Sequence, residues 1–177
     1  DLKTMHDKLD TTERLQLRPT VVEDAEFIFR LMNTPKWIQY IGDRQIRTVK
    51  DAENYIANNM APQLERLGYS NYTVIRKTDN AKIGTCGLYD REGLEGIDLG
   101  FAFLPEYERK GYAFEASQAL LDKAANQFKI ACLSAITVPD NIASQRLLKK
   151  LGFEFTETTQ LKGSELFVYK IKLNGKQ

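Results

Sequence analysis

The sequence predicts a single α/β domain built on a central β-sheet. Strand-like and helix-like apolar patterns follow one another along the chain in the order β-α-α-β-β-β-α-β-α-β-β. The length of 177 residues fits one domain and is enough to bury a core without disulfide or metal staples. No internal repeat, low-complexity segment or interdomain linker divides the sequence. We therefore expect an N-terminal tail over residues 1–13 and one domain over residues 14–177.

The first strand and the first helix are marked by punctuating residues. Residues 15–18 alternate apolar and polar side chains and are followed by Pro19, as expected for a strand that ends there. Thr20 and Glu23 have the spacing of a capping box, which predicts a helix from this point to about Met32.

A second helix is predicted by the same signals. Thr48 and Asp51 again have capping-box spacing, and Gly68 is a suitable residue to end a helix after Leu67. Its apolar side consists of residues at helical spacing: Tyr55, Ile56, Met60 and Leu64.

The middle of the chain predicts a meander of three strands. We expect strands over residues 71–76, 82–89 and 97–104. Residues 78–80 (T-D-N) have the composition of a hairpin turn, and residues 90–96 form a polar loop. A central helix follows, with Leu120, Leu121, Ala124 and Phe128 on one side. The remaining elements are a strand over 132–138, a helix over 141–151 ended by Gly152, and a hairpin of strands 153–161 and 165–173 about Lys162-Gly163.

Charge and composition exclude several classes of protein. The 25 basic and 24 acidic residues nearly balance, so we expect no dominant attraction to nucleic acid or to a membrane surface. No run approaches the roughly 18 apolar residues of a membrane span, and no signal peptide is visible, which favours the cytoplasm. Cys86 and Cys132 lie in apolar strand-like runs and are predicted to be buried, reduced thiols.

The single histidine restricts the chemistry. His6 lies in the polar N-terminal segment, which we expect to be a loose tail. A Ser-His-Asp or Cys-His catalytic pair needs an imidazole in the site, and histidine-containing zinc sites need one too. We therefore expect no metal site, and proton transfer by a carboxylate, a tyrosine, a lysine or ordered water.

One turn has the features of a phosphate site. Residues 104–114 read L-P-E-Y-E-R-K-G-Y-A-F, between a predicted strand that stops at Pro105 and the central helix. The first N–H groups of a helix have no partner within it, and the helix dipole favours an anion there. Gly111 allows a ligand to approach the backbone, and Arg109 and Lys110 add positive charge.

With a second motif, this turn resembles the GNAT superfamily of acyl-CoA-dependent N-acetyltransferases. The second motif is V-P-D-N-I-A-S at residues 138–144, followed by L-G-F at 151–153. The G-Y-A-F-E-A run at 111–116 is most similar to the branch that acetylates the N-termini of ribosomal proteins. The resemblance extends from about residue 15 to residue 173. One departure is Glu108, where the family pattern [QR]-x-x-G-x-[GA] has Gln or Arg, so that a donor is lost and a carboxylate is gained.

The resemblance implies a fold and a reaction. The fold is a mixed, mostly antiparallel sheet of six to seven strands with about four helices. Strands 97–104 and 132–138 are parallel neighbours in it that splay apart and hold the pantetheine arm. The reaction is transfer of acetyl from acetyl-CoA to a primary amine by direct attack on the thioester.

Cofactor-binding residues follow from the motif positions. The backbone of Phe101, Ala102 and Phe103 is expected to pair with pantetheine amides, although both Phe side chains also suit the core. Asn141 suits a pantetheine contact as well as a helix N-cap, and Ser144 suits the thiol end as well as an exposed helical position. The phosphates are expected on the turn formed by Arg109, Lys110, Gly111, Tyr112, Ala113 and Phe114.

Asp98 is the best candidate for the catalytic base. It lies in I-D-L-G-F-A-F, where the N-terminal acetyltransferase branch has A-E-L-G-Y, and an ordinary structural carboxylate is the alternative. Glu92 and Glu95 in the preceding loop are weaker candidates. Many relatives place a Tyr acid four residues beyond Ser144; Leu148 stands there, which makes Ser144 the candidate for assisting the thiolate.

The acceptor pocket is predicted at the irregular connection 33–47. This stretch is longer than most connections in a compact domain, and it contains Trp37 and Tyr40. Both aromatic side chains suit the core equally well, so a place in the pocket wall and a place in the core are both open for them.

Several functional alternatives remain at this stage. The acceptor is a peptide N-terminal α-amine in the favoured interpretation, with polyamines, aminoglycosides and small metabolites as alternatives. Cys86 as an acyl carrier is the competing covalent mechanism, without a histidine to activate it. A non-catalytic acyl-CoA-binding sensor is the alternative class. The protein is expected to be a monomer or a homodimer.

Overall fold

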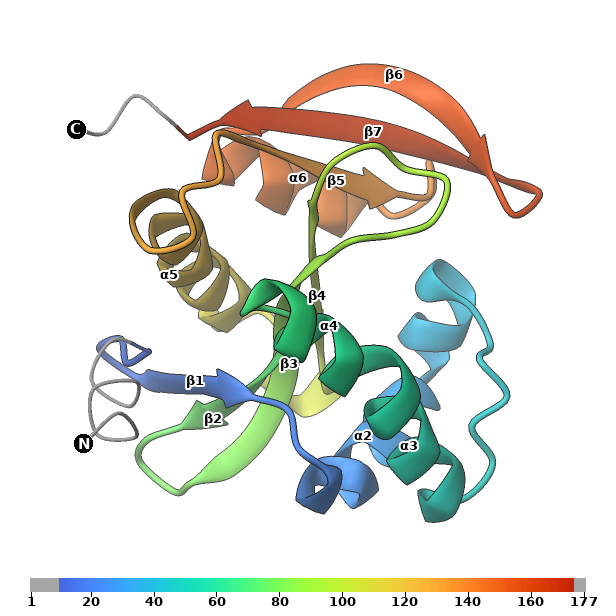
Figure 1. Cartoon of the computed structure of the whole chain (residues 1–177), viewed down its shortest axis with the longest axis vertical. Helices are drawn as coiled ribbons and strands as arrows, with labels where there is room; N and C mark the ends of the chain where they lie inside the picture. Colours follow the sequence, from blue (N-terminus) through green and yellow to red (C-terminus); the bar gives the residue numbers. More distant parts are fainter. Residues whose placement is uncertain (1–9, 174–177) are drawn as a thin grey trace.

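A seven-stranded mixed sheet organises the protein. The computed structural model describes residues 10–173, so the predictions for His6 and residues 1–9 lie outside the described part. Every neighbouring pair of strands is antiparallel except β4 and β5, which run parallel (Figure 1). The predicted mixed, mostly antiparallel sheet is therefore confirmed. The order across the sheet is β1 (Leu15–Pro19), β2 (Asn71–Arg76), β3 (Ala81–Tyr89), β4 (Asp98–Phe103), β5 (Cys132–Thr137), β7 (Ser164–Lys172) and β6 (Glu154–Leu161).

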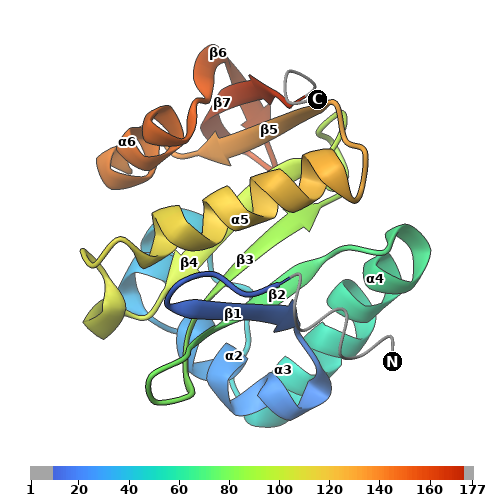
Figure 2. The same cartoon turned by 90° about the vertical axis from the view of Figure 1, so that its left-hand side faces the viewer.

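Helices cover both faces of the sheet. On one face α5 (Tyr112–Asn126) and α6 (Ile142–Leu151) lie along the strands (Figure 2). The other side carries α2 (Ala25–Met32), α3 (Val49–Tyr55) and α4 (Ala61–Leu67). Each side has its own apolar cluster. None of the helices within residues 10–173 has both the length and the apolar character needed to span a membrane.

Local capping residues fix where the helical segment from α3 to α4 begins and where it ends. The Asp51 N–H donates to Thr48 Oγ1 at 3.0 Å, and the Thr48 N–H donates back to the Asp51 carboxylate at 3.2 Å, so the predicted capping box forms. Gly68 ends the helix at a φ of 84°, as predicted. A π-helical segment, Ile56–Met60, divides this predicted helix in two, which gives five α-helices in the described residues where about four were expected.

Three local predictions are wrong. Thr20 does not cap the first helix; its hydroxyl forms a hydrogen bond with Thr73 Oγ1 at 2.8 Å, and the chain enters α2 through a 3₁₀ turn, Val22–Asp24. The irregular connection contains a π-helical turn, Trp37–Ile41. Cys132, the first residue of β5, is exposed and not buried as predicted, whereas Cys86 is buried as predicted.

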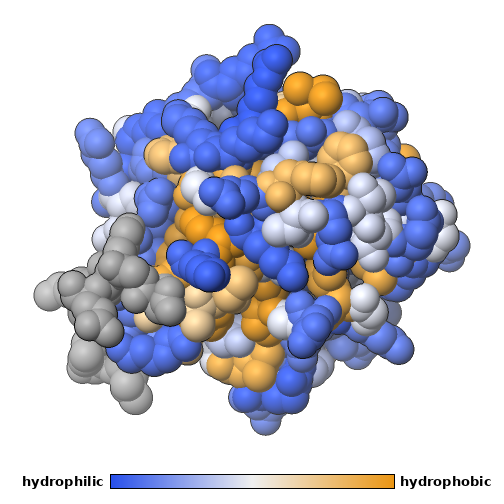
Figure 3. All heavy atoms as spheres, turned by 90° about the horizontal axis from the view of Figure 1, so that it is seen from above, coloured by the Kyte–Doolittle hydropathy of each residue, from blue (hydrophilic) through white to orange (hydrophobic). Residues whose placement is uncertain are grey.

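The outer strand of the sheet is solvated. Seen from above, hydrophilic side chains cover much of the surface and apolar atoms show between them in patches (Figure 3). Phe155 on β6 is 50% exposed, but its ring contacts those of Phe167 and Tyr169 at centroid distances of 5.2 and 5.7 Å. The edge strand thus keeps its exposed apolar side chain, Phe155, partly covered by aromatic neighbours.

A buried carboxylate ties α2 to the sheet. The Asp24 side chain is 0% exposed and accepts hydrogen bonds from Arg18 at 2.7 and 2.8 Å. Lys82 Nζ lies 2.7 Å from the same carboxylate, and the Val21 N–H donates to it at 2.9 Å. Burial alone would raise the pKa of Asp24, but the hydrogen bonds from Arg18 and Lys82 outweigh it and hold that pKa well below its usual range.

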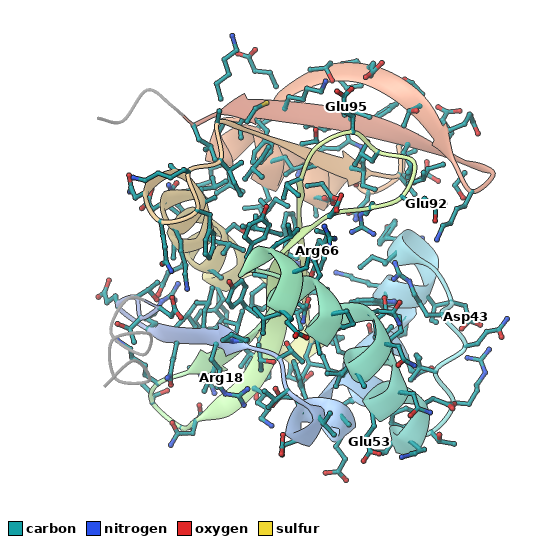
Figure 4. The ribbon with its side chains drawn as sticks, viewed as in Figure 1. Arg18, Asp43, Glu53, Arg66, Glu92 and Glu95 are labelled. Atoms are coloured by element: carbon teal, nitrogen blue, oxygen red, sulfur yellow. The ribbon has the colours of Figure 1, made fainter. Side chains whose placement is uncertain are left out.

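Asp24→Asn is expected to lower the free energy of unfolding at pH 7 by roughly 3 kcal/mol, because two partly solvated cations lose their buried counter-charge. The pKa of folded Asp24 lies below the unfolded value of about 3.9, so its stabilisation is complete above that pH and is lost below it. Urea unfolding of parent and variant should therefore differ at pH 7 and converge toward pH 2. The control is Asp43→Asn, which breaks an exposed pair with Arg47 (Asp43 is labelled in Figure 4) and should have far less effect. Equal stability of parent and Asp24→Asn at pH 7 would contradict this account.

Candidate active site

The parallel strands β4 and β5 separate almost at once. Their only registered pair is Asp98 with Ser134, and the Ser134 N–H donates to the Ile97 carbonyl at 3.0 Å. Beyond this pair β4 and β5 diverge (Figure 1). The edge of β4 that faces β5 therefore carries backbone N–H and C=O groups without strand partners. This is the splayed pair that the family resemblance implied.

The side chains at the end of β4 belong to the core. Phe101 and Phe103 pack on the apolar cluster beneath α5 and α6, and Ala102 packs on the opposite cluster. Alternation along the strand thus directs the side chains to the two faces and leaves the main chain at the splayed edge. The core and ligand interpretations of this segment are compatible.

The turn into α5 presents unpaired backbone donors. After the 3₁₀ turn Pro105–Tyr107, Arg109 and Gly111 take φ values of 63° and 82°, and Gly111 is the N-cap of α5. The first helical hydrogen bond runs from the Glu115 N–H to the Gly111 carbonyl at 3.0 Å. The N–H groups of the first three helical residues therefore have no acceptor in the helix. These residues are Tyr112, Ala113 and Phe114.

Arg14 holds this turn in place. Its Nη1 donates to the Lys110 carbonyl at 2.9 Å, and its Nε lies 2.7 Å from the Glu115 carboxylate. Nearby, a surface groove of about 750 Å³ runs beside Gly111 and Phe114. Lys150 from α6 also lines it, with its ammonium 4.3 Å from the centre of the Phe114 ring. The groove therefore has the start of α5 and the ammonium group of Lys150 in its walls.

Glu108, where the family pattern has Gln or Arg, is paired. Its carboxylate forms a salt bridge with Lys36, which lies directly before the π-helical turn. A cation therefore offsets the negative charge that the sequence places beside the turn. The pair also connects this turn to the predicted acceptor segment.

Asn141 and Ser144 lie at the start of α6, after the end of β5. The Ser144 N–H donates to Asn141 Oδ1 at 3.2 Å, so Asn141 is the N-cap. Within the described residues the Ser144 hydroxyl and the Asn141 side-chain nitrogen form no hydrogen bond. Leu148 is 1% exposed and faces the core. Capping uses only the oxygen of Asn141, which leaves the two donors of its amide for a ligand.

Asp98 is buried where β4 and β5 still pair. Its side chain is 0% exposed, and both carboxylate oxygens lie 3.0 Å from Nε of Arg91. Burial raises the pKa of Asp98, and the charge and hydrogen bonding of Arg91 oppose that rise. The alternative carboxylates, Glu92 and Glu95, are exposed on the loop in front of β5 and β7 (Figure 4). Asp98 is thus the only one of the three that strand geometry holds beside the splay.

The two predicted acceptor residues differ in their surroundings. Trp37 is half-buried against the apolar cluster of α2 and α3, and its indole Nε1–H is buried without an acceptor in the described residues. Tyr40 is also half-buried but belongs to neither apolar cluster. The structure brings both onto one π-helical turn, and Tyr40 is the better probe of a pocket.

Comparison with known proteins places the chain in a family. Residues 14–154 match the model of the acetyltransferase (GNAT) domain. This chain belongs to the GNAT family of acetyltransferases. It is 29% identical over 142 residues to the uncharacterised N-acetyltransferase YnaD of Bacillus subtilis, covering 80% of each chain. A GNAT-family acetyltransferase from Bacillus anthracis superposes with a TM-score of 0.75 at 26% identity, covering 92% of this chain and 97% of that one.

A second solved structure has the same fold. The ribosomal L7/L12 α-N-protein acetyltransferase RimL, solved with coenzyme A, has a TM-score of 0.78 at 17% identity, covering 92% of this chain and 96% of that chain. At this identity the likeness concerns the fold alone. With its named relatives, the GNAT domain makes this chain an N-acetyltransferase, and the fold implies acetyl-CoA as the acetyl donor.

Within this GNAT domain, Cys86 is poorly suited to carry an acyl group. Its side chain is fully buried, and burial raises the pKa of the thiol to about 12 despite a contact with Ser117 Oγ at 3.6 Å. A thiol with that pKa is almost entirely protonated near pH 7, so it is a weak nucleophile. Direct transfer needs no such residue.

Three residues of this site were missed by sequence reasoning. Arg14 and Lys36 act on the α5 turn through partners about a hundred and about seventy residues away, and Arg91 acts on Asp98 across a loop. A sequence pattern reports local spacing, and the first two contacts are not local. For Arg91 the sequence did contain a signal, because it is the single basic residue in the loop before Asp98, seven residues ahead of it.

Proposed function

We propose that the protein transfers acetyl from acetyl-CoA directly to the α-amine of a peptide or protein N-terminus. The observation that carries the proposal is the splay of β4 and β5 beside the unpaired N–H groups of α5. The free edge of β4 suits the pantetheine amides, and the start of α5 suits the pyrophosphate. Asn141, at the far side of the splay, suits a further amide of the same arm.

The reaction needs few protein groups. The neutral amine nitrogen attacks the thioester carbonyl carbon, whose oxygen is polarised by backbone N–H groups of β4. The carbon–sulfur bond then breaks, and the thiolate departs beside the Ser144 hydroxyl, which donates a hydrogen bond to it. The attacking nitrogen loses its extra proton to the departing thiolate, which gives the amide and free CoA thiol. Before the attack Asp98 accepts the proton of the ammonium. Because Arg91 covers Asp98, this proton passes through a water molecule.

The choice of acceptor has separate support. RimL, which shares the fold, acts on a protein α-amine, as its name states. The run at residues 111–116 resembles the same branch. A small amine is the alternative acceptor, and a non-catalytic acyl-CoA sensor the alternative function. The cytoplasmic location and the monomeric or homodimeric state stay predictions.

An acceptor screen tests this proposal. Thiol release from acetyl-CoA would be measured against N-terminal peptides, polyamines, aminoglycosides and small metabolite amines. The proposal expects the highest kcat/KM with a peptide and an acetylated α-amine in the product by mass spectrometry. A polyamine or an aminoglycoside as the best acceptor would overturn the choice of substrate and leave the transferase activity intact.

Tyr40→Ala is expected to raise the acceptor KM while leaving acetyl-CoA affinity unchanged, because Tyr40 packs in neither apolar cluster. Steady-state kinetics and calorimetry would measure the two quantities. Tyr40→Phe is the matched control and keeps the ring. If the acceptor KM and acetyl-CoA affinity worsen together with a lower melting temperature, Tyr40 is a core residue instead.

A further inference from the structure

Arg91 is an arginine whose terminal nitrogens have no partner. It lies in the loop between β3 and β4, and its Nε donates to both oxygens of Asp98 at 3.0 Å. Its Nη1 and Nη2 form no hydrogen bond within the described residues, and 29% of the side chain is exposed. These donors are therefore accessible to an acceptor group from outside the chain.

The guanidinium lies over bare backbone at the splay. Nη2 is 3.8 Å from the position that a Cβ on Gly100 would occupy. Gly100 belongs to β4 two residues beyond Asp98, past the last pairing with β5. The free donors of Arg91 therefore lie beside the strand edge proposed to hold the thioester.

Tyr89 fixes the orientation of the guanidinium. The Arg91 Cζ lies 5.0 Å from the centre of the Tyr89 ring. That ring passes over β4 so closely that a Cβ on Gly100 would be 2.8 Å from its edge. The Tyr89 hydroxyl is anchored in turn by donating to the Asn71 side chain. Arg91 is thus held on two sides, by Tyr89 and Asp98, with its terminal nitrogens free.

We infer that Arg91 and Asp98 together recognise an α-amino carbonyl unit, in which an amine and a C=O group flank one carbon. The carbonyl oxygen accepts hydrogen bonds from the free nitrogens of Arg91, and the α-amine is thereby placed where one water molecule connects it to Asp98. A peptide N-terminus and a free amino acid share this unit, whereas polyamines and simple alkylamines lack the oxygen. The inference rests on the proposed function and makes Arg91 a specificity-determining residue.

A matched set of acceptors tests the inference. The set is alaninamide, free alanine, an alanyl tripeptide and 2-aminopropane, which has the same branched carbon without a carbonyl. Rates are compared at equal concentrations of neutral amine, since the amines differ in pKa. The parent should prefer alaninamide and the tripeptide, or alanine, over 2-aminopropane by more than about tenfold in kcat/KM. The preferred carbonyl compound distinguishes a peptide N-terminus from an amino acid.

Arg91→Lys supplies the decisive variant. It keeps a positive charge opposite Asp98 and removes the planar fork of donors. Its preference for carbonyl acceptors over 2-aminopropane should fall to within about threefold, because KM rises more for the carbonyl acceptors than for 2-aminopropane. The control is Arg66→Lys, which alters an exposed pair with Asp90 at the start of the same loop (Arg66 is labelled in Figure 4) and should keep the preference.

Each outcome decides the inference. A parent enzyme that uses 2-aminopropane as well as alaninamide overturns it, as does an Arg91→Lys variant that retains the full preference. If Arg91→Lys fails to fold, the preference of the parent alone still decides. Failure of every amine to release thiol would count against the proposed function instead, so the two failures are distinguishable.

Discussion

Asp98→Asn should lower kcat/KM at least about a hundredfold at pH 7 and recover part of the loss at pH 9. A peptide α-amine titrates near ~8 and a lysine-like amine near ~10, so at pH 7 the acceptor is mostly ammonium and needs a base. At pH 9 more of it is already neutral, and the loss of the base matters less. Burial raises the pKa of Asp98. When the pH is lowered, parental activity should therefore begin to fall at a higher pH than it would with an exposed carboxylate as the base.

Two controls separate catalysis from folding. Asp98→Asn leaves Arg91 without its buried counter-charge, so the melting temperature and acetyl-CoA affinity of the variant must be measured. Glu26→Gln removes an exposed carboxylate from α2 and should change neither the rate nor the pH response. Ser144→Ala should slow thiolate departure and keep the parental pH response. If Asp98→Asn retained near-parental activity from pH 6 to pH 9, Asp98 would be structural, and Glu92, Glu95 or water would take the proton.

Gly111→Asp should weaken acetyl-CoA binding by more than about tenfold, because it adds a carboxylate beside phosphates held at a helix N-terminus. The residue also has a φ of 82°, which favours Gly and tolerates Asn or Asp. Gly111→Asn is therefore the matched control, with similar shape and no charge, and should bind acetyl-CoA more tightly than Gly111→Asp. Arg109→Ala should cost about 1 kcal/mol or less, since an exposed ion pair contributes little.

Calorimetry with coenzyme A measures these affinities without turnover. The order from tightest to weakest should be parent, Arg109→Ala, then Gly111→Asp. If Gly111→Asp bound coenzyme A as tightly as the parent, the α5 turn would not be the phosphate site. The assignment of the backbone donors at residues 112–114 would then be wrong as well.

Most of the fold is readable from local patterns, and the errors have a common cause. The strand 71–76 forms with the predicted bounds, and the capping box at Thr48 forms as its spacing predicts. Thr20 fails because Asp24, held by the distant Lys82, organises the start of α2 in its place. Capping is predictable where its partners are close in sequence, and fails where a long-range contact decides.

The candidate site divides in the same way. The turn before α5 and the Asn141 cap are visible in sequence, because one short segment contains the whole feature. The pairs Lys36–Glu108 and Arg91–Asp98 are not, because they depend on how separate elements meet. The sequence identifies the reaction class, whereas the three-dimensional contacts suggest which acceptor is recognised.

Acetyl transfer by this GNAT domain to an amine can be measured as thiol release from acetyl-CoA with and without an alanyl peptide, followed by mass spectrometry of the peptide. We expect release that depends on the peptide, with one acetylated peptide per thiol released. Tight binding of acetyl-CoA with no release in the presence of any amine would contradict it and would identify the protein as an acyl-CoA sensor.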